Sequence, residues 1–504
     1  MITWLAWIAG IAAFLTLASL LALWSYGRFA RRARGPNSRS IPVADDGPLD
    51  RVLAPLEAAH PGLSGAALNI DNREAFAQRM QSAALARRSI DAMYYIWRDD
   101  LTGKLLAQGL LEAADRGVRV RLLLDDVNVL GRDPTYLALN SHPRIEVRLF
   151  NPIRAREGSI WRGIEMLLNL VRYNRRMHCK AWIVDGRVAL IGGRNVGDVY
   201  FDAGTGRRRN VRDLDLVLAG AILREAETVF DRYWNDGLAL PISALWKKKR
   251  SDLTAFRARL GQHGLSRRAR AWRARCPFQG GDALQLAALH WTDSLRLIAD
   301  PPEKALGNGR RGWLPTELQP MLRGARGSLQ IMTPYFVPGT EGMQSLVDTA
   351  GQGVQVCVVT NTLAVADHVT VHGAYRWYRK RLLAAGVQLF EVHARNQPRR
   401  MLHSKAFIVD HRRGFVGSFN FDLRSAFLNT EMGIVFEDET LLAALQAEFD
   451  WCRGPEQSYG LVLDGRLVGW QRAGAEMHKL EPGTGWVRRT FSFIIGHLPI
   501  HRWL

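Results

Sequence analysis

Apolar and polar positions follow the same order in the two halves of the chain. In the first half, the pattern over 89–126 predicts a buried strand, an amphipathic helix and a second buried strand. The second half repeats this order over 327–361. Strands that alternate with helices favour an α/β fold with a mostly parallel sheet flanked by helices. Because the pattern occurs twice, we predict two such lobes related by a pseudo-twofold axis.

The N-terminal segment is apolar throughout. No charged residue lies between Ile2 and Gly27, and about 20 apolar residues suffice to cross a bilayer. No Lys or Arg precedes the segment, which argues against a cleaved signal peptide, the main alternative. Four arginines follow it directly: Arg28, Arg31, Arg32 and Arg34. By the positive-inside rule, we predict a retained, single-pass transmembrane helix with the rest of the chain in the cytoplasm.

These patterns divide the chain into five predicted parts. They are a transmembrane anchor (1–27), a basic linker (28–64), a first lobe (65–240), a basic inter-lobe segment (241–300) and a second lobe that ends in a basic, aromatic tail (301–504). The linker is rich in Pro, Gly, Ser and Asp, as is typical of a connecting segment.

Three stretches combine basic and apolar residues. The stretch 154–176 has apolar residues at helical spacing between arginines, so it is either an amphipathic segment on a membrane surface or a helix packed on the first lobe. The inter-lobe segment contacts lipid head groups or a nucleic-acid backbone, or it forms a solvated helical hairpin. The tail 488–504 is too short to span a bilayer but suits an interfacial contact.

The net charge indicates the kind of partner, and the cysteine content indicates which covalent or metal sites to expect. The formal net charge of +20 favours a polyanion, either an anionic membrane surface or nucleic acid. The four cysteines form no C-x-x-C pair, so neither a disulfide framework nor a zinc site is indicated. Cys179 lies between His178 and Lys180, and because strand side chains alternate, its thiol should face the core. We expect neither a metal nor a cofactor.

The most specific feature is a motif, H-x-K-x4-D, that occurs in both halves. Its residues are His178, Lys180 and Asp185 in the first half, and His403, Lys405 and Asp410 in the second. A glycine-containing turn follows each copy, and an asparagine lies seventeen residues after each histidine. Two complete copies predict two half-sites that face each other and share one reaction, with the histidines and lysines as catalytic residues.

The residue types of the motif suit a phosphate diester. A histidine and a lysine two positions apart on a strand lie on the same side. The lysine then offers positive charge to phosphate oxygens, while the histidine attacks phosphorus or moves a proton. Asn195 and Asn420 can donate to the same oxygens. The turns at 192–193 and 417–418 let the backbone approach closely. Ser418 in the second turn is a further candidate for binding or orienting the phosphate.

A nucleophilic histidine needs a carboxylate on its other ring nitrogen. Glu431 lies 28 residues after His403 and is the candidate in the second half. No acid lies 28 residues after His178, so Asp213 or Asp215 is the expected counterpart in the first half. With two histidines at one phosphorus, a two-step displacement through a phosphohistidine becomes available.

The motif aspartates, Asp185 and Asp410, stand at strand ends just before turns. Aspartate is common at such positions because it forms local hydrogen bonds. Although both belong to the catalytic motif, we favour a structural role for them over a catalytic one.

On these residues, the chain resembles the phospholipase D superfamily, in which H-x-K-x4-D is duplicated and G-[GS]-x-N follows. It is most similar there to bacterial cardiolipin synthases of the C type, through runs such as AADRGVRVRLLLDD, NRRMHCKAWIVDGRVALIGGRNVGDVYF and the ending LPIHRWL. The resemblance implies metal-independent transphosphatidylation through a phosphohistidine, with His178 as nucleophile and His403 as acid and base. It also implies phospholipid substrates and a place in the bacterial inner membrane.

The sequence therefore leads to one preferred function and two alternatives. The preferred function is a membrane-bound phosphatidyltransferase that forms cardiolipin from phosphatidylglycerol and a phospholipid donor. A phospholipase D that hydrolyses phospholipids would use the same half-sites. A nuclease is less expected because a transmembrane anchor is unusual for one, and an inactive scaffold is disfavoured because both motifs are intact. The oligomeric state stays open.

Overall fold

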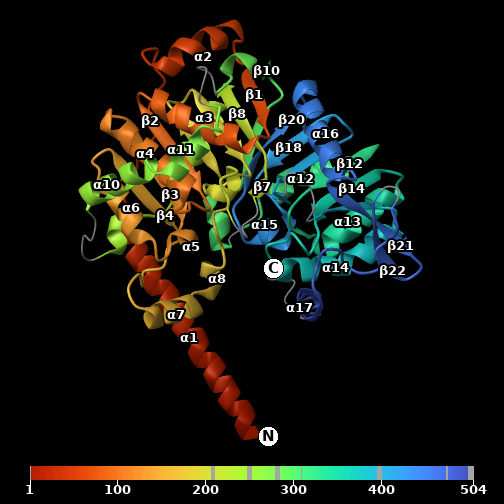
Figure 1. Ribbon diagram of the computed structural model, residues 1–504. Coiled ribbons are helices and arrows are strands. Elements are labelled where there is room, and N and C mark those ends of the chain that lie inside the picture. The colour runs from red at the N-terminus through yellow and green to blue at the C-terminus, as the bar shows by residue number, and fades with distance from the viewer. Residues whose placement is uncertain are drawn as a thin grey trace.

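The computed structural model describes residues 2–205, 210–246, 252–277, 284–307, 309–393, 400–472 and 475–497. Two α/β lobes lie side by side, and one long helix, α1 (Ile2–Ala33), projects from the lower end of the first (Figure 1). The ending LPIHRWL, which contributes to the resemblance, lies outside the described residues.

The first lobe contains a nine-stranded sheet. From one edge to the other its strands are β10 (His290–Thr292), β1 (Ser64–Asn69), β8 (Asp215–Gly220), β6 (Val188–Gly192), β5 (Ala181–Val184), β2 (Ser89–Tyr94), β3 (Arg119–Asp125), β4 (Ile145–Phe150) and β9 (Ala239–Pro241). The change to the second lobe falls inside the predicted inter-lobe segment, because β10 still belongs to this sheet.

The second lobe repeats this arrangement. Its sheet runs β11 (Arg296–Ala299), β20 (Met432–Phe436), β18 (Arg413–Gly417), β17 (Ala406–Val409), β12 (Ser328–Met332), β14 (Gln355–Asn361), β15 (Gln388–Val392), β21 (Ser458–Asp464) and β22 (Leu467–Gln471). From β8 to β9 and from β20 to β21, equivalent neighbours pair in the same sense. The prediction of two related α/β lobes is therefore confirmed.

The prediction of mostly parallel sheets is wrong, because both sheets are mixed. Parallel pairing joins only β2 to β3 to β4 and, in the second lobe, β12 to β14 to β15. The other pairs within these two sheets are antiparallel. The motif itself explains this: β5 and β6 are joined by a three-residue turn, 185–187, and a parallel pair needs a crossover of a dozen residues or more.

Helices lie on the outer face of each sheet and also between the two sheets. In the first lobe they are α2 (Pro48–Ala59), α3 (Asn72–Leu85), α4 (Leu101–Asp115), α5 (Asp126–Val129), α6 (Asp133–Asn140) and α9 (Leu223–Trp234). In the second lobe they are α12 (Leu314–Arg323), α13 (Gly339–Gly351), α14 (Val369–Ala384), α15 (Leu423–Phe427), α16 (Glu439–Arg453) and α17 (Trp486–Gly496).

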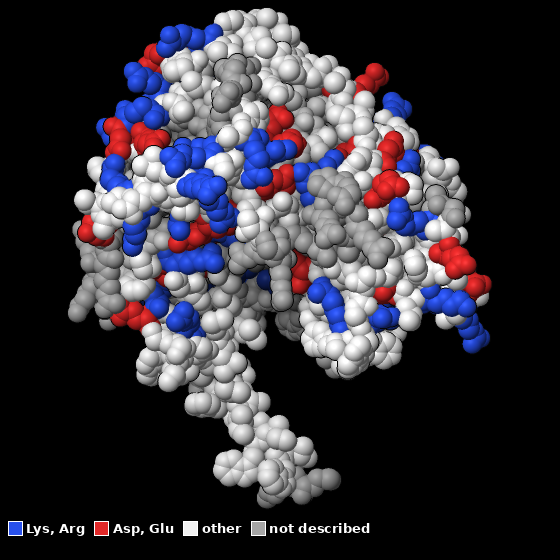
Figure 2. Space-filling view, viewed as in Figure 1, with Lys and Arg blue, Asp and Glu red and all other residues white. Residues whose placement is uncertain are grey.

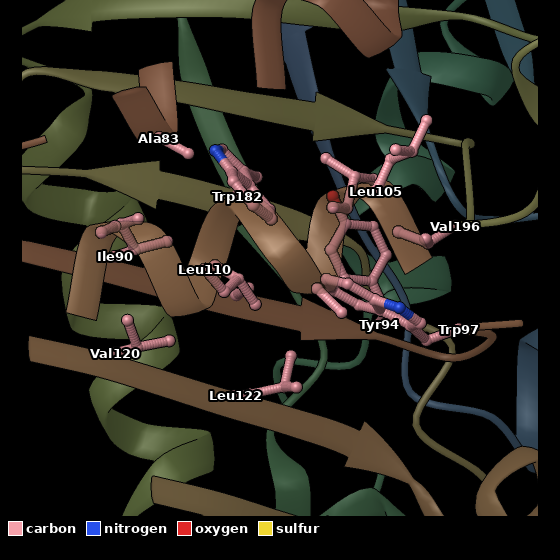
Figure 3. Packing of buried hydrophobic residues seen from close by; sticks show 14 of the residues in the cluster. Ala83, Ile90, Tyr94, Trp97, Leu105, Leu110, Val120, Leu122, Trp182 and Val196 are labelled. Atoms are coloured by element: carbon pink, nitrogen blue, oxygen red, sulfur yellow. The ribbon is translucent and has the colours of Figure 1, made fainter. Parts of the chain in front are cut away.

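The outer core of the first lobe forms between α4 and the sheet. Figure 3 shows Leu105 and Leu110 of α4 beside Val120 and Leu122 of β3. Trp182 of β5 belongs to the same cluster. These side chains are buried because the apolar face of the amphipathic helix lies on the sheet. The predicted helix and its two flanking strands are thus confirmed.

A second core joins the lobes. It contains Ile183, Ile191 and Leu216 from the first sheet together with Ile408 and Ile434 from the second, all at most 2% exposed. Because one continuous apolar layer includes both sheets, the lobes form a single body, and the ends of their motif strands are held in a fixed relation.

Two segments predicted to connect other parts are packed on the first lobe. After α1, the chain lies along the lobe, where Arg148 donates to the carbonyl of Pro36 (2.6 Å) and Arg121 to that of Ser38 (3.1 Å). In the inter-lobe segment, α10 (Leu253–Gly264) and α11 (Arg267–Arg273) form a helical hairpin whose Trp272 ring lies 4.5 Å from Phe76. Lys247–Ser251, its lysine-rich start, lies outside the described residues.

Four helices at the lower end of the molecule expose apolar side chains. α1 is long and apolar enough to cross a membrane, with a mean hydropathy of 2.2, and the window that gives this value is unburied. In the stretch 154–176, α7 (Ser159–Leu168) lies against α1 and has no buried residue, and α8 (Leu170–Tyr173) follows it. α17 of the second lobe lies at the same end, as Figure 1 shows. Figure 2 shows the projecting part of α1 as uncharged.

Candidate active site

The two motif histidines lie where the lobes meet. His178 lies three residues before the first residue of β5, and His403 lies three residues before that of β17. The backbone N–H of His178 donates to the carbonyl of Thr430, and that of His403 donates to the carbonyl of Arg212, both at 2.8 Å. Each histidine is therefore positioned by main chain from the opposite half. Both are nearly buried, at 7% and 6% exposure.

The short strands β7 (Asn210–Arg212) and β16 (Arg400–Leu402) show the same exchange. They pair in parallel, although one comes from each half of the chain. The two halves thus exchange segments: the main chain at Thr430 lies beside His178, and the main chain at Arg212 lies beside His403.

The carboxylate beside each histidine also comes from the opposite half of the chain. His178 Nδ1 lies 2.8 Å from Glu431 Oε2, and His403 Nδ1 lies 2.5 Å from Asp213 Oδ2. The prediction that each histidine pairs with an acid of its own half is wrong, although Glu431 and Asp213 are the right residues. Asp215, the other candidate, instead binds Arg79 (2.8 Å).

The glycine-containing turns explain why these acids reach across. A Cβ atom at Gly193 would collide with the Asp213 carboxylate. In the second half, Ser418 takes the equivalent place, and its hydroxyl donates to Glu431 at 2.5 Å. The turns therefore make room for the carboxylates, and Ser418, predicted to be a phosphate-binding residue, holds Glu431.

Burial and charge set the protonation of the two acids. Burial raises the pKa of Glu431 to about 7, against the hydrogen bonds from Ser418 and Ser425 and the charge of Lys180. Burial alone would also raise the pKa of Asp213, but the hydrogen bond from His403 and the charge of Lys405 lower it below its usual value. Asp213 is thus ionised at neutral pH, which suits it to stabilise a protonated His403.

The two histidines are kept neutral. Burial lowers the pKa of His178 well below its usual value, and the charges of Lys180 and Lys405 lower it further. Burial and Lys405 also lower the pKa of His403, but there Asp213 opposes them. A neutral imidazole that donates Nδ1–H to a carboxylate has an unprotonated Nε2. The site therefore offers two basic nitrogens.

The motif lysines are buried beside the histidines. Lys180 Nζ donates to the carbonyl of His178 at 2.5 Å, and Lys405 Nζ donates to that of His403. Burial lowers the pKa of Lys180 to about 7 and that of Lys405 to about 8. An anion that enters the site would raise both values and be held by both charges.

The two asparagines occupy different surroundings. Asn195 accepts from the backbone N–H of Ile96 (3.0 Å) and donates to the hydroxyl of Tyr200 (3.1 Å). Within the described residues, Asn420 Oδ1 is buried without a hydrogen-bond partner. The contact of these two amides with phosphate stays a prediction.

Comparison with known proteins agrees with this arrangement. The family model described as "Cardiolipin synthase, PLD-like domain" matches residues 77–234 and 318–453, one match in each lobe. The chain belongs to the phospholipase D-like family. Its two intact half-sites make it an enzyme of the phospholipase D type.

Individual relatives cover most of this phospholipase D-like chain. Cardiolipin synthase C of Escherichia coli K12 is 36% identical over 481 residues, which is 90% of this chain and 99% of the relative. A cardiolipin synthase of Alkalihalophilus pseudofirmus is 27% identical over 72% of this chain and 60% of its own length. The crystal structure of phosphatidylserine synthase from Haemophilus influenzae has the same fold, with a TM-score of 0.58 and 14% identity over 89% of this chain and 95% of that one.

The motif aspartates of this family member bind backbone N–H groups, which agrees with the structural role that we favoured. Asp185 accepts from the backbone N–H groups of Arg87, Arg88 and Ser89 at 2.7–2.8 Å. Asp410 accepts from those of 326–328 in the same way. Each aspartate fixes the loop that leads into the neighbouring antiparallel strand, β2 or β12, at the end of the motif strand remote from the histidine.

Sequence reasoning missed three site residues of the phospholipase D-like pocket. Ser425 donates to Glu431 Oε1 at 2.8 Å. Tyr95 and Tyr200 lie edge-on to His178 and His403, with ring centroids 4.9 and 5.4 Å apart. Tyr200 and Ser425 each lie 22 residues after the motif histidine of their half, but they differ in residue type, so only their position in the folded chain identifies them and Tyr95. Cys179 was predicted correctly: its thiol is buried in the core that joins the lobes.

Proposed function

We propose that the protein is a membrane-bound phosphatidyltransferase that forms cardiolipin from phosphatidylglycerol and a phospholipid donor. The crossed histidine–carboxylate pairs carry this proposal, because they hold two neutral histidines at the junction of the lobes. A phosphate diester that enters there meets two imidazole nitrogens and two lysine side chains. The similarity to a relative named cardiolipin synthase C supports a lipid as the substrate.

The reaction takes two displacement steps at one phosphorus. In the first, His178 Nε2 bonds to the phosphorus of the donor, the bond to the head-group oxygen breaks, and protonated His403 gives that oxygen its proton. In the second, His403 takes the proton of the terminal hydroxyl of phosphatidylglycerol. The hydroxyl oxygen bonds to phosphorus as the phosphorus–nitrogen bond breaks, which releases cardiolipin and restores His178.

The electrostatics support this division of roles. His178 has its pKa lowered well below the usual value, so it stays unprotonated and nucleophilic. His403 lies on the ionised Asp213, and the negative charge of a bound phosphate further favours its protonated form. The acid is thus the histidine whose carboxylate best stabilises an imidazolium.

The decisive experiment identifies the products of the purified protein. We expect detergent-solubilised enzyme with phosphatidylglycerol, with and without phosphatidylethanolamine, to form cardiolipin that mass spectrometry detects. Phosphatidic acid without cardiolipin would show transfer to water instead, which is the phospholipase D alternative. Cleavage of DNA without either lipid product would overturn both lipid functions.

We further propose that the protein lies on the cytoplasmic face of the bacterial inner membrane. α1 supplies the span, and its arginine flank favours the cytoplasmic side. Exposed apolar side chains of both lobes point to the same surface: Trp161 and Leu167 on α7 are 71% and 64% exposed, and Trp486 and Phe491 on α17 are 74% and 49% exposed. Such side chains are stabilised at the interface between head groups and acyl chains.

Single introduced cysteines test this orientation, since all four native cysteines are buried. Nitroxide labels at Trp161→Cys and Phe491→Cys should collide more with oxygen than with a polar nickel complex in phosphatidylglycerol vesicles. Leu265→Cys, an exposed position after α10 that is 72% accessible, is the control and should favour the nickel complex. Equal behaviour at all three positions would contradict the proposed surface. Labelling of Leu265→Cys by an impermeant maleimide in right-side-out vesicles would contradict the cytoplasmic side.

A further inference from the structure

A cavity of about 470 Å³ lies where α1 meets the first lobe. One face of α1 forms its first wall, through Leu23, Tyr26, Gly27, Ala30 and Arg31. These residues are three or four positions apart or adjacent to such a pair, so they share a helix face. The opposite wall consists of α8 and the residues after it, together with Leu238 and Leu306.

The cavity is both apolar and basic. Leu23, Val171 and Leu306 contribute apolar surface. The charged lining residues are three arginines, Arg31, Arg172 and Arg175, and one acid, Asp236. An excess of guanidinium groups beside apolar side chains suits an amphiphile that carries a phosphate.

Arg172 gives the clearest indication that the cavity suits an anion. It is only 7% exposed, and its Nη1 donates to Asn151 Oδ1 at 2.6 Å. Among the described residues, its Nε and Nη2 have no hydrogen-bond partner, nor has the buried hydroxyl of Tyr26, whose ring the guanidinium covers at 3.6 Å. Buried donors without acceptors are costly and rare in native proteins. Phosphate oxygens in this cavity would supply those acceptors.

The cavity lies at head-group depth and near the reacting histidines. Its α1 wall spans the change from the apolar run to the arginine flank that begins at Arg28. Arg175 precedes His178 by three residues, which corresponds to at most about 11 Å of chain. Arg175 Nη1 also donates to the carbonyls of Lys304 (3.1 Å) and Phe427 (3.3 Å), so this wall is joined to the second-lobe segments beside the site.

We propose that this cavity binds the phosphodiester of the acceptor phospholipid, the molecule whose hydroxyl receives the phosphatidyl group. The proposal rests on the proposed function and adds a second phosphate site to it. During transfer, the donor phosphorus is bound to His178, so the acceptor's own phosphate needs a separate cationic site. An acceptor held by Arg31, Arg172 and Arg175 keeps its acyl chains along α1 and presents its terminal glycerol hydroxyl to His403.

Two variants test the cavity without touching the reacting residues. A Cβ atom at Gly27 would approach only the far end of Arg31, at 3.6 Å, so Gly27→Phe can fill the cavity without a backbone collision. Arg31→Gln removes one exposed charge, and Arg32→Gln is its matched control, because Arg32 is the next exposed arginine of α1 but does not line the cavity. Each is assayed with phosphatidylethanolamine as donor and with either phosphatidylglycerol or free glycerol as acceptor.

We expect Gly27→Phe to lower transfer to phosphatidylglycerol about tenfold relative to transfer to glycerol, which has neither phosphate nor acyl chains. Arg31→Gln should raise the KM for phosphatidylglycerol by about tenfold, as the loss of one charge-assisted bond implies, and Arg32→Gln should not. An equal fall with both acceptors, or equal effects of the two arginine variants, would overturn the acceptor site. If the unaltered protein forms no cardiolipin, the proposed function fails, and the inference fails with it.

Discussion

His403→Asn is expected to trap the phosphatidyl group on His178. With a phosphatidyl p-nitrophenol donor, the departing phenolate needs no proton, so the first step still proceeds in this variant. The second step needs His403 to deprotonate the acceptor, and the loss of such a base slows it by about 10²–10⁴-fold. We expect a burst of one equivalent of p-nitrophenolate, followed by slow turnover, and an enzyme whose intact mass is increased by one phosphatidyl group.

His178→Asn is the matched variant for this experiment. It removes the nucleophile, so no burst and no covalent adduct should form, and steady-state turnover should fall by about 10⁶-fold, as for other covalent catalysts. A burst in His178→Asn and none in His403→Asn would reverse the two roles. Neither variant disturbs the core, because the imidazoles lie at the junction of the lobes and both retain slight exposure.

The crossed carboxylates lead to the second large effect. Asp213→Asn should behave like His403→Asn, with a burst and slow turnover, because Asp213 holds the second-lobe histidine. Glu431→Gln should instead slow the burst itself, because Glu431 orients the nucleophile His178. Replacing such an orienting carboxylate by its amide costs about 10⁴-fold in a comparable triad, since the wrong tautomer is favoured.

Rapid-quench kinetics with the same donor distinguish the two variants. If each acid served the histidine of its own half, the outcomes would be exchanged: Asp213→Asn would slow the burst and Glu431→Gln would preserve it. Glu437→Gln is the surface control, because Glu437 lies six residues after Glu431 in an exposed ion pair with Arg413. It should leave both phases unchanged, as exposed pairs contribute little.

Local pattern predicted much of the fold. The strand, helix and strand of each half could be located because apolar periodicity is set by the face that each element buries. The same reasoning gave the wrong sheet type, because the βαβ pattern covers only β2 to β4 and its repeat. The turn at Asp185 and Gly186, both with positive φ, makes β5 and β6 an antiparallel hairpin.

In the site, too, the sequence predicted some residues and only the folded structure identified the others. His178, Lys180, His403 and Lys405 were predicted because their spacing places them on one side of a strand and because the motif is repeated. Tyr200 and Ser425 lie at the same distance along the chain from their histidines but share no residue type, and Tyr95 belongs to no motif. The role of Ser418 depends on an acid thirteen residues further along the chain. Contacts of that kind appear only once the loops have folded.

The sequence by itself determined the duplicated lobes, the motif residues, Glu431 as one of the two acids and the apolar N-terminal helix, because each depends on local spacing or composition. The tertiary structure alone decided which acid serves which histidine and where the cavity beside α1 lies. Both depend on backbone pairing and packing between segments far apart in the chain, such as Thr430 against His178 and α8 against α1. These contacts form only when the two lobes pack on their common core, so no local sequence pattern predicts them.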